Sequence, residues 1–267
     1  MATVVHPSAF VDPSAELGEG VVVGPCAVIE ASVVIGDECR IDAFASVKEF
    51  TRMGARNHVY SYAHVGGEPQ DLKFRGEESW LIIGNDNRIR EFSTMHRGTE
   101  GGGGRTVIGD NNLFMAYTHV AHDCLVGNHV IMSNCATLAG HVEVADYAIL
   151  GGLSAVHQFT RVGAGSFLGG TSSISQDLPP FMLAVGNRGG VHAPNLVGLR
   201  RHHASSEAVA GLKKAYKLIW QSDMPRKEAL DLLLAEYGEH REIRLFVEFV
   251  NASQRGILPA AQENIQD

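Results

Sequence analysis

The residues of this chain best suited to chemistry are histidines that lie close to an acid. His122 is followed directly by Asp123, and His141 and His157 come later in the same region. A carboxylate beside an imidazole fixes its tautomer and raises its basicity, so this pair could act as a general base. The same histidines could instead hold zinc, since imidazole is the commonest ligand of that metal. Either use requires the histidines to meet in the fold.

A repeat of six residues must position these histidines. Beginning at Val5, all 26 positions of the register are apolar, although only 45% of the chain is apolar. The register runs through residues 5–65, 83–95 and 108–174. A period of six is neither the helical period of about 3.6 nor the alternation of a simple strand, so the unit is a short strand plus a turn. Three units make one 18-residue coil of a triangular, parallel β-helix.

The coil predicts which candidate residues come together. Val120, Leu138 and Val156 stand at intervals of 18 residues, so they should lie above one another on coils about 4.8 Å apart. We therefore expect His122, His141 and His157 to converge at one edge, and His119 to lie close by. A single histidine at a turn needs no function, but a stacked set indicates a site.

Two insertions interrupt the repeat, near residues 67–80 and 99–106. Loops that break a regular solenoid often carry function. The first insertion contains Asp71 and Lys73, which suit an anionic or sugar substrate. The second contains four successive glycines at 101–104, so we expect it to supply mainly flexibility.

Helical spacing replaces the six-residue register toward the C-terminus. We therefore divide the chain into a β-helical domain over residues 1–187 and a helical domain over residues 188–267. The first helix should begin near Ser205, which can cap it, and two more should occupy residues 226–237 and 239–254.

Composition excludes several classes of protein. Thirty acidic residues against 22 Lys and Arg give a formal charge of −8, which argues against general nucleic-acid binding. The chain has no run of 18 apolar residues and no signal-peptide pattern over Met1–His6, so we expect a cytoplasmic protein without membrane insertion. Its four cysteines have neither zinc nor disulfide spacing, and we expect each of them at an interior repeat position.

Six short motifs give a more specific signal. They are Gln70–Lys73, Asn87–Glu91, His96–Thr99, Ala121–Cys124, Ala136–His141 and Ala155–Phe159. With these motifs and its helical tail, the chain resembles the UDP-N-acetylglucosamine 3-O-acyltransferases, which catalyse the first step of lipid A synthesis. The resemblance implies a left-handed β-helix and a homotrimer with sites between neighbouring subunits. It also implies transfer of a 3-hydroxyacyl chain from acyl carrier protein to the glucosamine 3-hydroxyl of UDP-N-acetylglucosamine, with no metal or other cofactor.

The resemblance further implies roles for individual residues. His122 would be the general base, supported by Asp123, and the backbone N–H of Gly140 would bind the oxyanion. Substrate contacts would come from Asp71, Lys73, His119, His141, His157, Gln158, Asn195 and Arg201. A basic patch would dock the acidic carrier protein, and it consists of Arg200, Arg201, Lys213, Lys214 and Lys217. The acyl groove would pass Gly170 and Phe167, where glycine leaves room for a longer chain.

The chain departs from the family pattern at three positions in its C-terminal part. Many members have an acid at the position of Val197, a histidine at Arg188 and a strong base at His202. These departures concern the nucleotide and carrier contacts and leave the acyltransferase assignment intact. Three alternatives stay open. They are a zinc enzyme like the gamma-class carbonic anhydrases, the N-acyltransferase that acts later in the same pathway, and a non-catalytic β-helix scaffold. The N-acyltransferase resembles a longer chain with an extra N-terminal domain.

Overall fold

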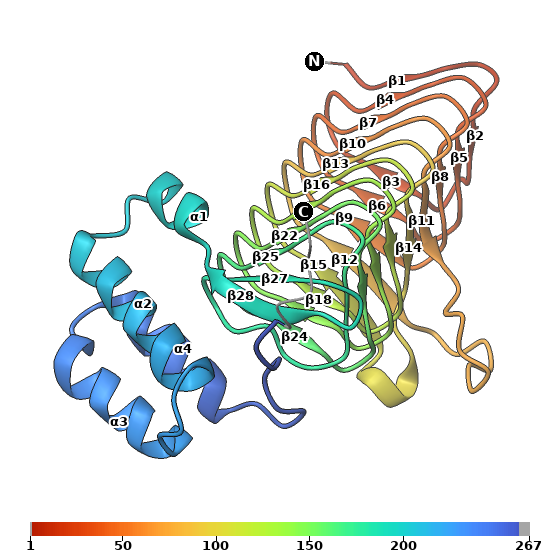
Figure 1. The fold of residues 1–267 in the computed structure, drawn as a ribbon. Helices are drawn as coiled ribbons and strands as arrows, with labels where there is room; N and C mark the ends of the chain where they lie inside the picture. Colours follow the sequence, from red (N-terminus) through yellow and green to blue (C-terminus); the bar gives the residue numbers. More distant parts are fainter. Residues whose placement is uncertain (1, 262–267) are drawn as a thin grey trace.

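The computed structural model describes residues 2–261, which form a triangular prism of parallel strands with a group of helices beside its C-terminal end (Figure 1). Each face of the prism is one sheet, here named A, B and C. Sheet A contains β1 (Val4–Val5), β4 (Val22–Val23), β7 (Arg40–Ile41), β10 (His58–Val59), β13 (Arg88–Ile89), β16 (Leu113–Phe114), β19 (Ile131–Met132), β22 (Ile149–Leu150), β25 (Phe167–Leu168), β27 (Met182–Val185) and β28 (Gly190–Pro194). Sheet B contains β2 (Phe10–Val11), β5 (Val28–Ile29), β8 (Ser46–Val47), β11 (His64–Gly67), β14 (Thr94–His96), β17 (His119–Val120), β20 (Thr137–Leu138), β23 (Ala155–Val156) and β26 (Ser173–Ile174). Sheet C contains β3 (Glu16–Leu17), β6 (Val34–Ile35), β9 (Thr51–Met53), β12 (Trp80–Ile83), β15 (Arg105–Ile108), β18 (Leu125–Val126), β21 (Glu143–Val144) and β24 (Arg161–Val162).

The pairing of the strands confirms the six-residue repeat. Val120 is the parallel partner of Leu138, and Leu138 is the partner of Val156, so neighbouring coils are 18 residues apart. The repeated apolar residue points into the prism, and Leu138 is fully buried. Where an insertion lengthens the coil, the register is kept across it, because Val65 pairs with Met95.

The corners of the prism are turned by single residues with left-handed backbone conformation. They recur every sixth residue, and they include Cys26 and Cys135, with φ of 56° and 61°. Side chains at such corners point away from the core. The predicted interior position is therefore wrong for Cys26, which is exposed, and for the half-buried Cys135, whereas Cys39 and Cys124 are buried.

The helices are α1 (Leu196–Arg201), α2 (Ser206–Trp220), α3 (Arg226–Tyr237) and α4 (Arg241–Asn251). Ser205 caps α2 as predicted, because its hydroxyl accepts a hydrogen bond from the N–H of Ala208. The predicted helix over 239–254 is shorter at both ends, and α1 was not predicted at all. Of the helices within residues 2–261, none is long and apolar enough to cross a membrane.

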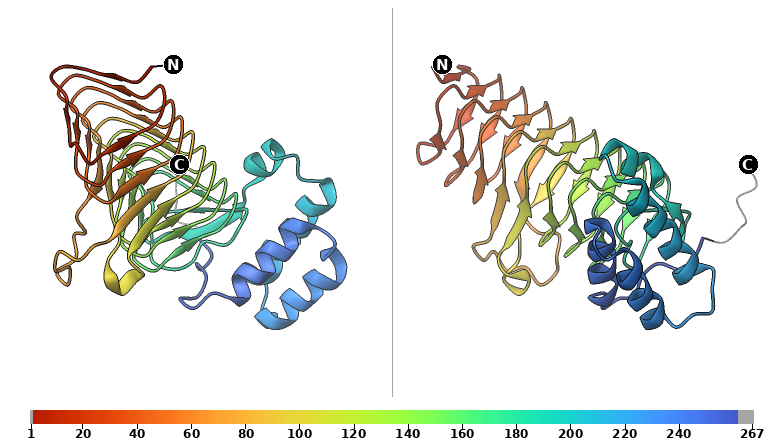
Figure 2. Two further views of the ribbon diagram at one scale, coloured as in Figure 1. Left: turned by 180° about the vertical axis from the view of Figure 1, so that it is seen from behind. Right: turned by 90° about the vertical axis from the view of Figure 1, so that its left-hand side faces the viewer.

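The helices are tied to the last coils of the prism (Figure 2). The indole N–H of Trp220 in α2 donates to the carbonyl of Leu258, which lies in the segment that returns to the prism. The proposed domain boundary between residues 187 and 188 falls between β27 and β28, which pair as antiparallel strands of sheet A. The division into two domains stays a prediction.

Candidate active site

One corner of the prism, between sheets B and C, brings together the two insertions and the candidate histidines. The first insertion connects β11 to β12, and the second connects β14 to β15. His122 and Asp123 lie between β17 and β18 on the following coil, and His141 lies between β20 and β21 on the next. Both insertions project from the same side of the prism (Figures 1 and 2). We name this region the B–C corner.

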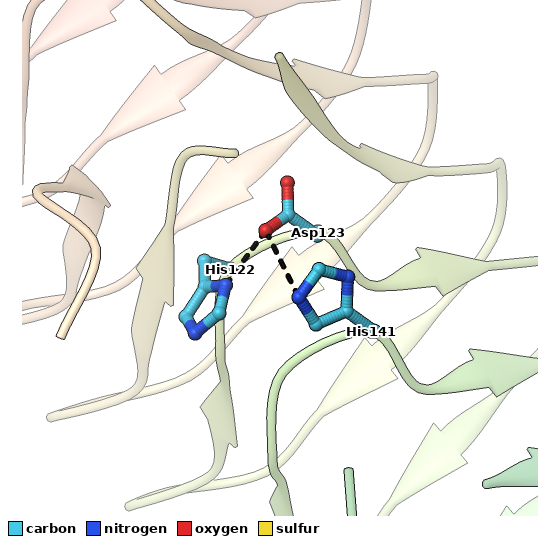
Figure 3. Close-up of side chains that lie close together, drawn as sticks. All are labelled: His122, Asp123 and His141. Atoms are coloured by element: carbon cyan, nitrogen blue, oxygen red, sulfur yellow. Dashed lines mark hydrogen bonds and ion pairs between the residues drawn. The ribbon is translucent and has the colours of Figure 1, made fainter. Parts of the chain in front are cut away.

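An Asp–His pair lies at the centre of the B–C corner. Nδ1 of His122 is 2.7 Å from Oδ2 of Asp123, and Nε2 of His141 is 3.6 Å from the same oxygen (Figure 3). The rings of His122 and His141 stand nearly perpendicular, with their centroids 5.2 Å apart. The ionised carboxylate can only accept hydrogen bonds, so it holds the proton of His122 on Nδ1 and leaves Nε2 as the basic nitrogen.

The coil period explains which residues meet at this corner. Asp123, His141 and Phe159 are one coil apart and all have left-handed φ, of 61°, 59° and 62°. Their side chains form one column, in which the ring of His141 stacks on Phe159 at 4.4 Å. His157 is not in this column, and its Nδ1 lies 3.0 Å from the carbonyl oxygen of Gln158. The structure thus brings His122 and His141 together at Asp123, and His157 lies between β23 and β24 on the coil after His141.

The second insertion is more ordered than predicted. It contains the 3-10 helix η1 (Glu100–Gly102), which Thr99 caps through its side chain. Thr99 also makes two hydrogen bonds to Asp123, one from its backbone N–H and one from its hydroxyl, each 2.7 Å long. The insertion therefore holds Asp123 in addition to the flexibility expected of its glycines. The signal in the sequence is a threonine two residues before the glycine run, because threonine is a favoured helix N-cap.

The site combines an ionised carboxylate with neutral imidazoles. Burial alone would raise the pKa of Asp123, but the hydrogen bonds from His122 and Thr99 outweigh it and lower the pKa below its ordinary value. Burial lowers the pKa of His119 and of His141. These rings are consequently uncharged near neutral pH and do not compete with His122 for the charge of Asp123.

His96, on the coil before His122, gives a prediction about stability. It is 6% exposed, its Nδ1 has no hydrogen-bond partner within the described residues, and burial lowers its pKa from 6.5 to about 4. Because the unfolded chain takes up a proton at a higher pH than the folded protein, stability is lost as the pH falls from 6.5 to about 4. The shift corresponds to roughly 3 kcal/mol. We expect His96→Phe to unfold with a flatter pH dependence than the parent in urea titrations across this window, and parallel curves would contradict the assignment.

The ligand atoms of His122, Asp123 and His141 lie within 4.8 Å of one another, which raises the question of a metal. Both carboxylate oxygens of Asp123 already accept hydrogen bonds from Thr99, and one of them also accepts from His122. The separation of 2.7 Å between His122 and Asp123 is that of a charge-assisted hydrogen bond. The donor set therefore fits an acid–base pair better than the three-histidine zinc site considered above.

A cleft of about 630 Å³ opens beside His141. It is lined by Asp71 and Lys73 of the first insertion, by Thr99 of the second, and by His141 and Phe159. The side chain of Lys73 is exposed, and its backbone N–H donates to Oδ1 of Asp71 at 3.0 Å. The structure thus brings the predicted substrate loop next to the Asp–His pair.

Gly140 and His119 lie beside this pair. A Cβ atom on Gly140 would be only 2.6 Å from Cε1 of His122, so the imidazole packs directly over the glycine backbone. Within residues 2–261, nothing accepts a hydrogen bond from the N–H of Gly140. Nδ1 of His119 is hydrogen bonded to the hydroxyl of Thr94 at 2.7 Å.

Other predicted residues lie away from the B–C corner. Gly170 is at the corner between sheets A and B, and Phe167 belongs to β25 of sheet A. The buried amide of Asn195 caps α1 by accepting from the N–H of Gly198, and it donates to the carbonyl of Gly165. In the basic patch, Lys214 pairs with Glu236. The exposed cations of the patch are Arg200, Arg201, Lys213 and Lys217.

Comparison with known proteins places this geometry in a family. The chain is 46% identical over 260 residues to an acyl-(acyl-carrier-protein)–UDP-N-acetylglucosamine O-acyltransferase of Burkholderia lata, and the match covers 96% of this chain and 99% of that protein. The chain belongs to the UDP-N-acetylglucosamine O-acyltransferase family. The profile of the family's second domain matches residues 177–258, and a profile of bacterial transferase hexapeptide repeats matches residues 105–140.

Solved structures of the family agree with this assignment. The UDP-N-acetylglucosamine acyltransferase of Campylobacter jejuni superposes with a TM-score of 0.91 at 40% identity, and covers 97% of this chain and 100% of that one. That of Francisella novicida gives a TM-score of 0.93 at 32% identity, and covers 98% of this chain and 95% of that one. The predicted fold class, a left-handed parallel β-helix followed by a small helical part, is confirmed, as is the predicted family.

Proposed function

We propose that this enzyme transfers a 3-hydroxyacyl chain from acyl carrier protein to the 3-hydroxyl of the glucosamine in UDP-N-acetylglucosamine, the first step of lipid A synthesis. The observation that carries the proposal is the hydrogen bond of 2.7 Å between His122 and Asp123, in a chain whose curated relatives carry the name of this reaction. Thr99 and His141, which both contact Asp123, line the adjoining cleft. The reaction needs a base for a sugar hydroxyl, a donor for an oxyanion and room for two substrates.

In the proposed mechanism, His122 acts first as a base and then as an acid. Its Nε2 removes the proton of the sugar hydroxyl while the oxygen attacks the thioester carbonyl, and a new C–O bond forms. Asp123 stabilises the resulting imidazolium through the Nδ1 hydrogen bond. When the tetrahedral intermediate collapses, the C–S bond breaks and Nε2 returns the proton to the sulfur of the carrier protein. These steps require neither a metal nor a covalent enzyme intermediate.

Gly140 suits the role of oxyanion donor. Its N–H has no acceptor among the described residues, and it lies directly beneath the imidazole of His122. A preorganised backbone N–H at the place where negative charge develops stabilises the transition state more than the ground state. Because glycine has no side chain, the thioester carbonyl can approach the backbone closely.

Lys73 is proposed to bind the anionic acceptor in the cleft. Its ammonium is exposed on the same loop as Asp71 and lines the cleft together with His141. We expect Lys73→Ala to raise KM for UDP-N-acetylglucosamine by about tenfold with little change in kcat, because it removes binding made equally in the ground and transition states. Steady-state kinetics with the acceptor varied checks this, with Lys227→Ala as the control, because that exposed lysine of α3 does not line the cleft. An unchanged KM would remove the proposed role.

The remaining predicted contacts fit a site that is shared between subunits. Gly170, Phe167, Asn195 and Arg201 are away from the B–C corner of their own chain. We propose that the enzyme is a homotrimer in which these residues, together with the basic patch, face the B–C corner of a neighbour. We propose that His119, His157 and Gln158 contact the substrate from the B–C corner of their own chain. The cytoplasmic location expected from the sequence stays a prediction.

The experiment that tests the function is an acyl-transfer assay with UDP-N-acetylglucosamine and 3-hydroxyacyl carrier proteins of several chain lengths, with products identified by mass. We expect one acylated sugar nucleotide, with a longer donor preferred because Gly170 leaves the groove open. If the protein is active only with added zinc and a chelator abolishes that activity, the zinc enzyme is favoured instead. No product with any donor would contradict the proposal.

A further inference from the structure

The carboxylate of Asp123 is held mainly by one residue that the proposed chemistry does not include. Its side chain is 1% exposed and accepts three hydrogen bonds, of which Thr99 provides two and His122 provides one. The backbone N–H of Thr99 binds Oδ1, and its hydroxyl binds Oδ2. Rotation of a carboxylate about its last side-chain bond is otherwise soft, so the single bond to His122 would not fix its plane.

We propose that Thr99 is a positioning residue for the acyl transfer, acting on His122 through Asp123. The inference rests on the proposed function, since it adds a third member to the Asp–His pair. By holding both oxygens, Thr99 keeps Asp123 ionised and aims Oδ2 at Nδ1 of His122. Partners of this kind commonly fix the orientation and tautomer of a functional histidine.

The direction of the hydrogen bonds supports this role. The hydroxyl of Thr99 accepts from the N–H of Gly102 at 3.2 Å, so its only proton is available to Oδ2 of Asp123. Asp123 is thereby an acceptor on every side, and the proton between it and His122 must belong to Nδ1. A chain of donors from Gly102 through Thr99 to Asp123 thus sets the tautomer in which Nε2 is free to take a proton.

The second insertion is shaped to bring Thr99 to this carboxylate. A Cβ atom on Gly102 would lie 2.0 Å from Cγ of Asp123, so only glycine allows the turn to close over the acid. The adjacent Gly101 has open space around the corresponding position, and neither glycine has left-handed φ. The two positions form a matched pair. An added methyl group meets Asp123 at Gly102, whereas at Gly101 it meets only the open space of the cleft.

The first test compares Thr99→Val, which loses the hydroxyl but keeps the backbone N–H, with Thr99→Ser, which keeps both donors. We expect Thr99→Val to lower kcat by roughly 10- to 100-fold, the loss typical of one hydrogen bond to a charged group, with little change in KM. The acid limb of its kcat profile should move to higher pH, because the Asp123–His122 pair loses a donor that favours the ionised carboxylate. Thr99→Ser should restore kcat and the pH profile to near those of the parent.

The second test compares Gly102→Ala with Gly101→Ala. We expect the first to lower kcat to a similar extent as Thr99→Val, since displacing a catalytic group by about 1 Å can cost 10²-fold. Gly101 lines the cleft, so both variants are compared at saturating acceptor and donor, where we expect kcat of Gly101→Ala within about twofold of the parent. Thermal unfolding of all four variants separates loss of the site from loss of the fold. Equal kcat values for the two alanine variants would contradict the role of the turn.

The outcomes distinguish this inference from the proposed function. If the parent forms product and His122→Ala does not, while Thr99→Val keeps the kcat and pH profile of the parent, Thr99 has no positioning role and the function stands. A raised KM with unchanged kcat in Thr99→Val would make Thr99 a substrate contact and overturn the inference. If the parent forms no product, the proposed function itself fails.

Discussion

His122→Ala is expected to lower kcat of acyl transfer by about 10²- to 10⁴-fold, the usual contribution of a general base. The variant loses the only basic nitrogen that is aligned by an ionised carboxylate at the B–C corner, within the described residues. Measurement of kcat at saturating acceptor and donor checks this directly. The neighbouring His141 does not replace it, because its nitrogen is 3.6 Å from Asp123 and its pKa is lowered by burial.

A matched control separates the chemistry of His122 from general effects of losing a histidine. His129 has the same left-handed corner conformation one hexad after Asp123, but it is exposed at the corner between sheets C and A. We expect His129→Ala to keep kcat within about twofold of the parent, as is usual for a surface substitution away from the site. Both variants should keep the thermal midpoint and oligomeric state of the parent. A turnover of His122→Ala close to that of His129→Ala would contradict the base assignment.

Gly140→Ala is the second substitution with a large expected effect. The new methyl group would lie 2.6 Å from Cε1 and 2.8 Å from Nε2 of His122, so the imidazole must swing away from it. Because the clashing atoms are at the free end of a side chain, the fold can adapt at little cost. The nitrogen that takes the proton is nevertheless displaced, and a misplacement of about 1 Å can lower kcat by 10²-fold.

The measurement for Gly140→Ala is kcat together with the free energy of unfolding. We expect the first to fall by about 10²-fold and the second to change by less than about 1 kcal/mol. Gly101→Ala, which adds the same group on the open side of the cleft, serves as the control for kcat at saturating substrates and for stability. If Gly140→Ala were as active as this control, neither the close packing of His122 on the glycine nor the oxyanion role of its N–H could be correct.

Much of the site could be predicted because the prism repeats so strictly. The period of 18 residues correctly placed Val120, Leu138 and Val156 above one another. Applied strictly, the same period puts His141 over Asp123, as the structure shows, and Gln158 rather than His157 two coils from His122. The intervals of 19 and 16 residues between the three histidines differ from the coil period, so His157 occupies a different position of the coil from His122 and His141.

The remaining features of the site depend on contacts that the six-residue repeat does not determine. The two bonds from Thr99 to Asp123 form because the second insertion turns back over the acid, and a turn outside the repeat has no register from which to place it. The short helix α1 escaped prediction because six residues are too few to show helical spacing. The cleft between the two insertions likewise depends on how both loops fold against the same corner.

The central claim is that His122, aligned by Asp123, activates the sugar hydroxyl without a metal. Its most direct test is a single-turnover assay in the presence of a chelator, in which enzyme in excess over 3-hydroxyacyl carrier protein is mixed with UDP-N-acetylglucosamine and the product is followed by mass. We predict rapid formation of the 3-O-acylated sugar nucleotide by the parent and a rate at least about 10²-fold lower for His122→Ala. Product formation that stops with chelator, or that proceeds equally fast in both proteins, would contradict the claim.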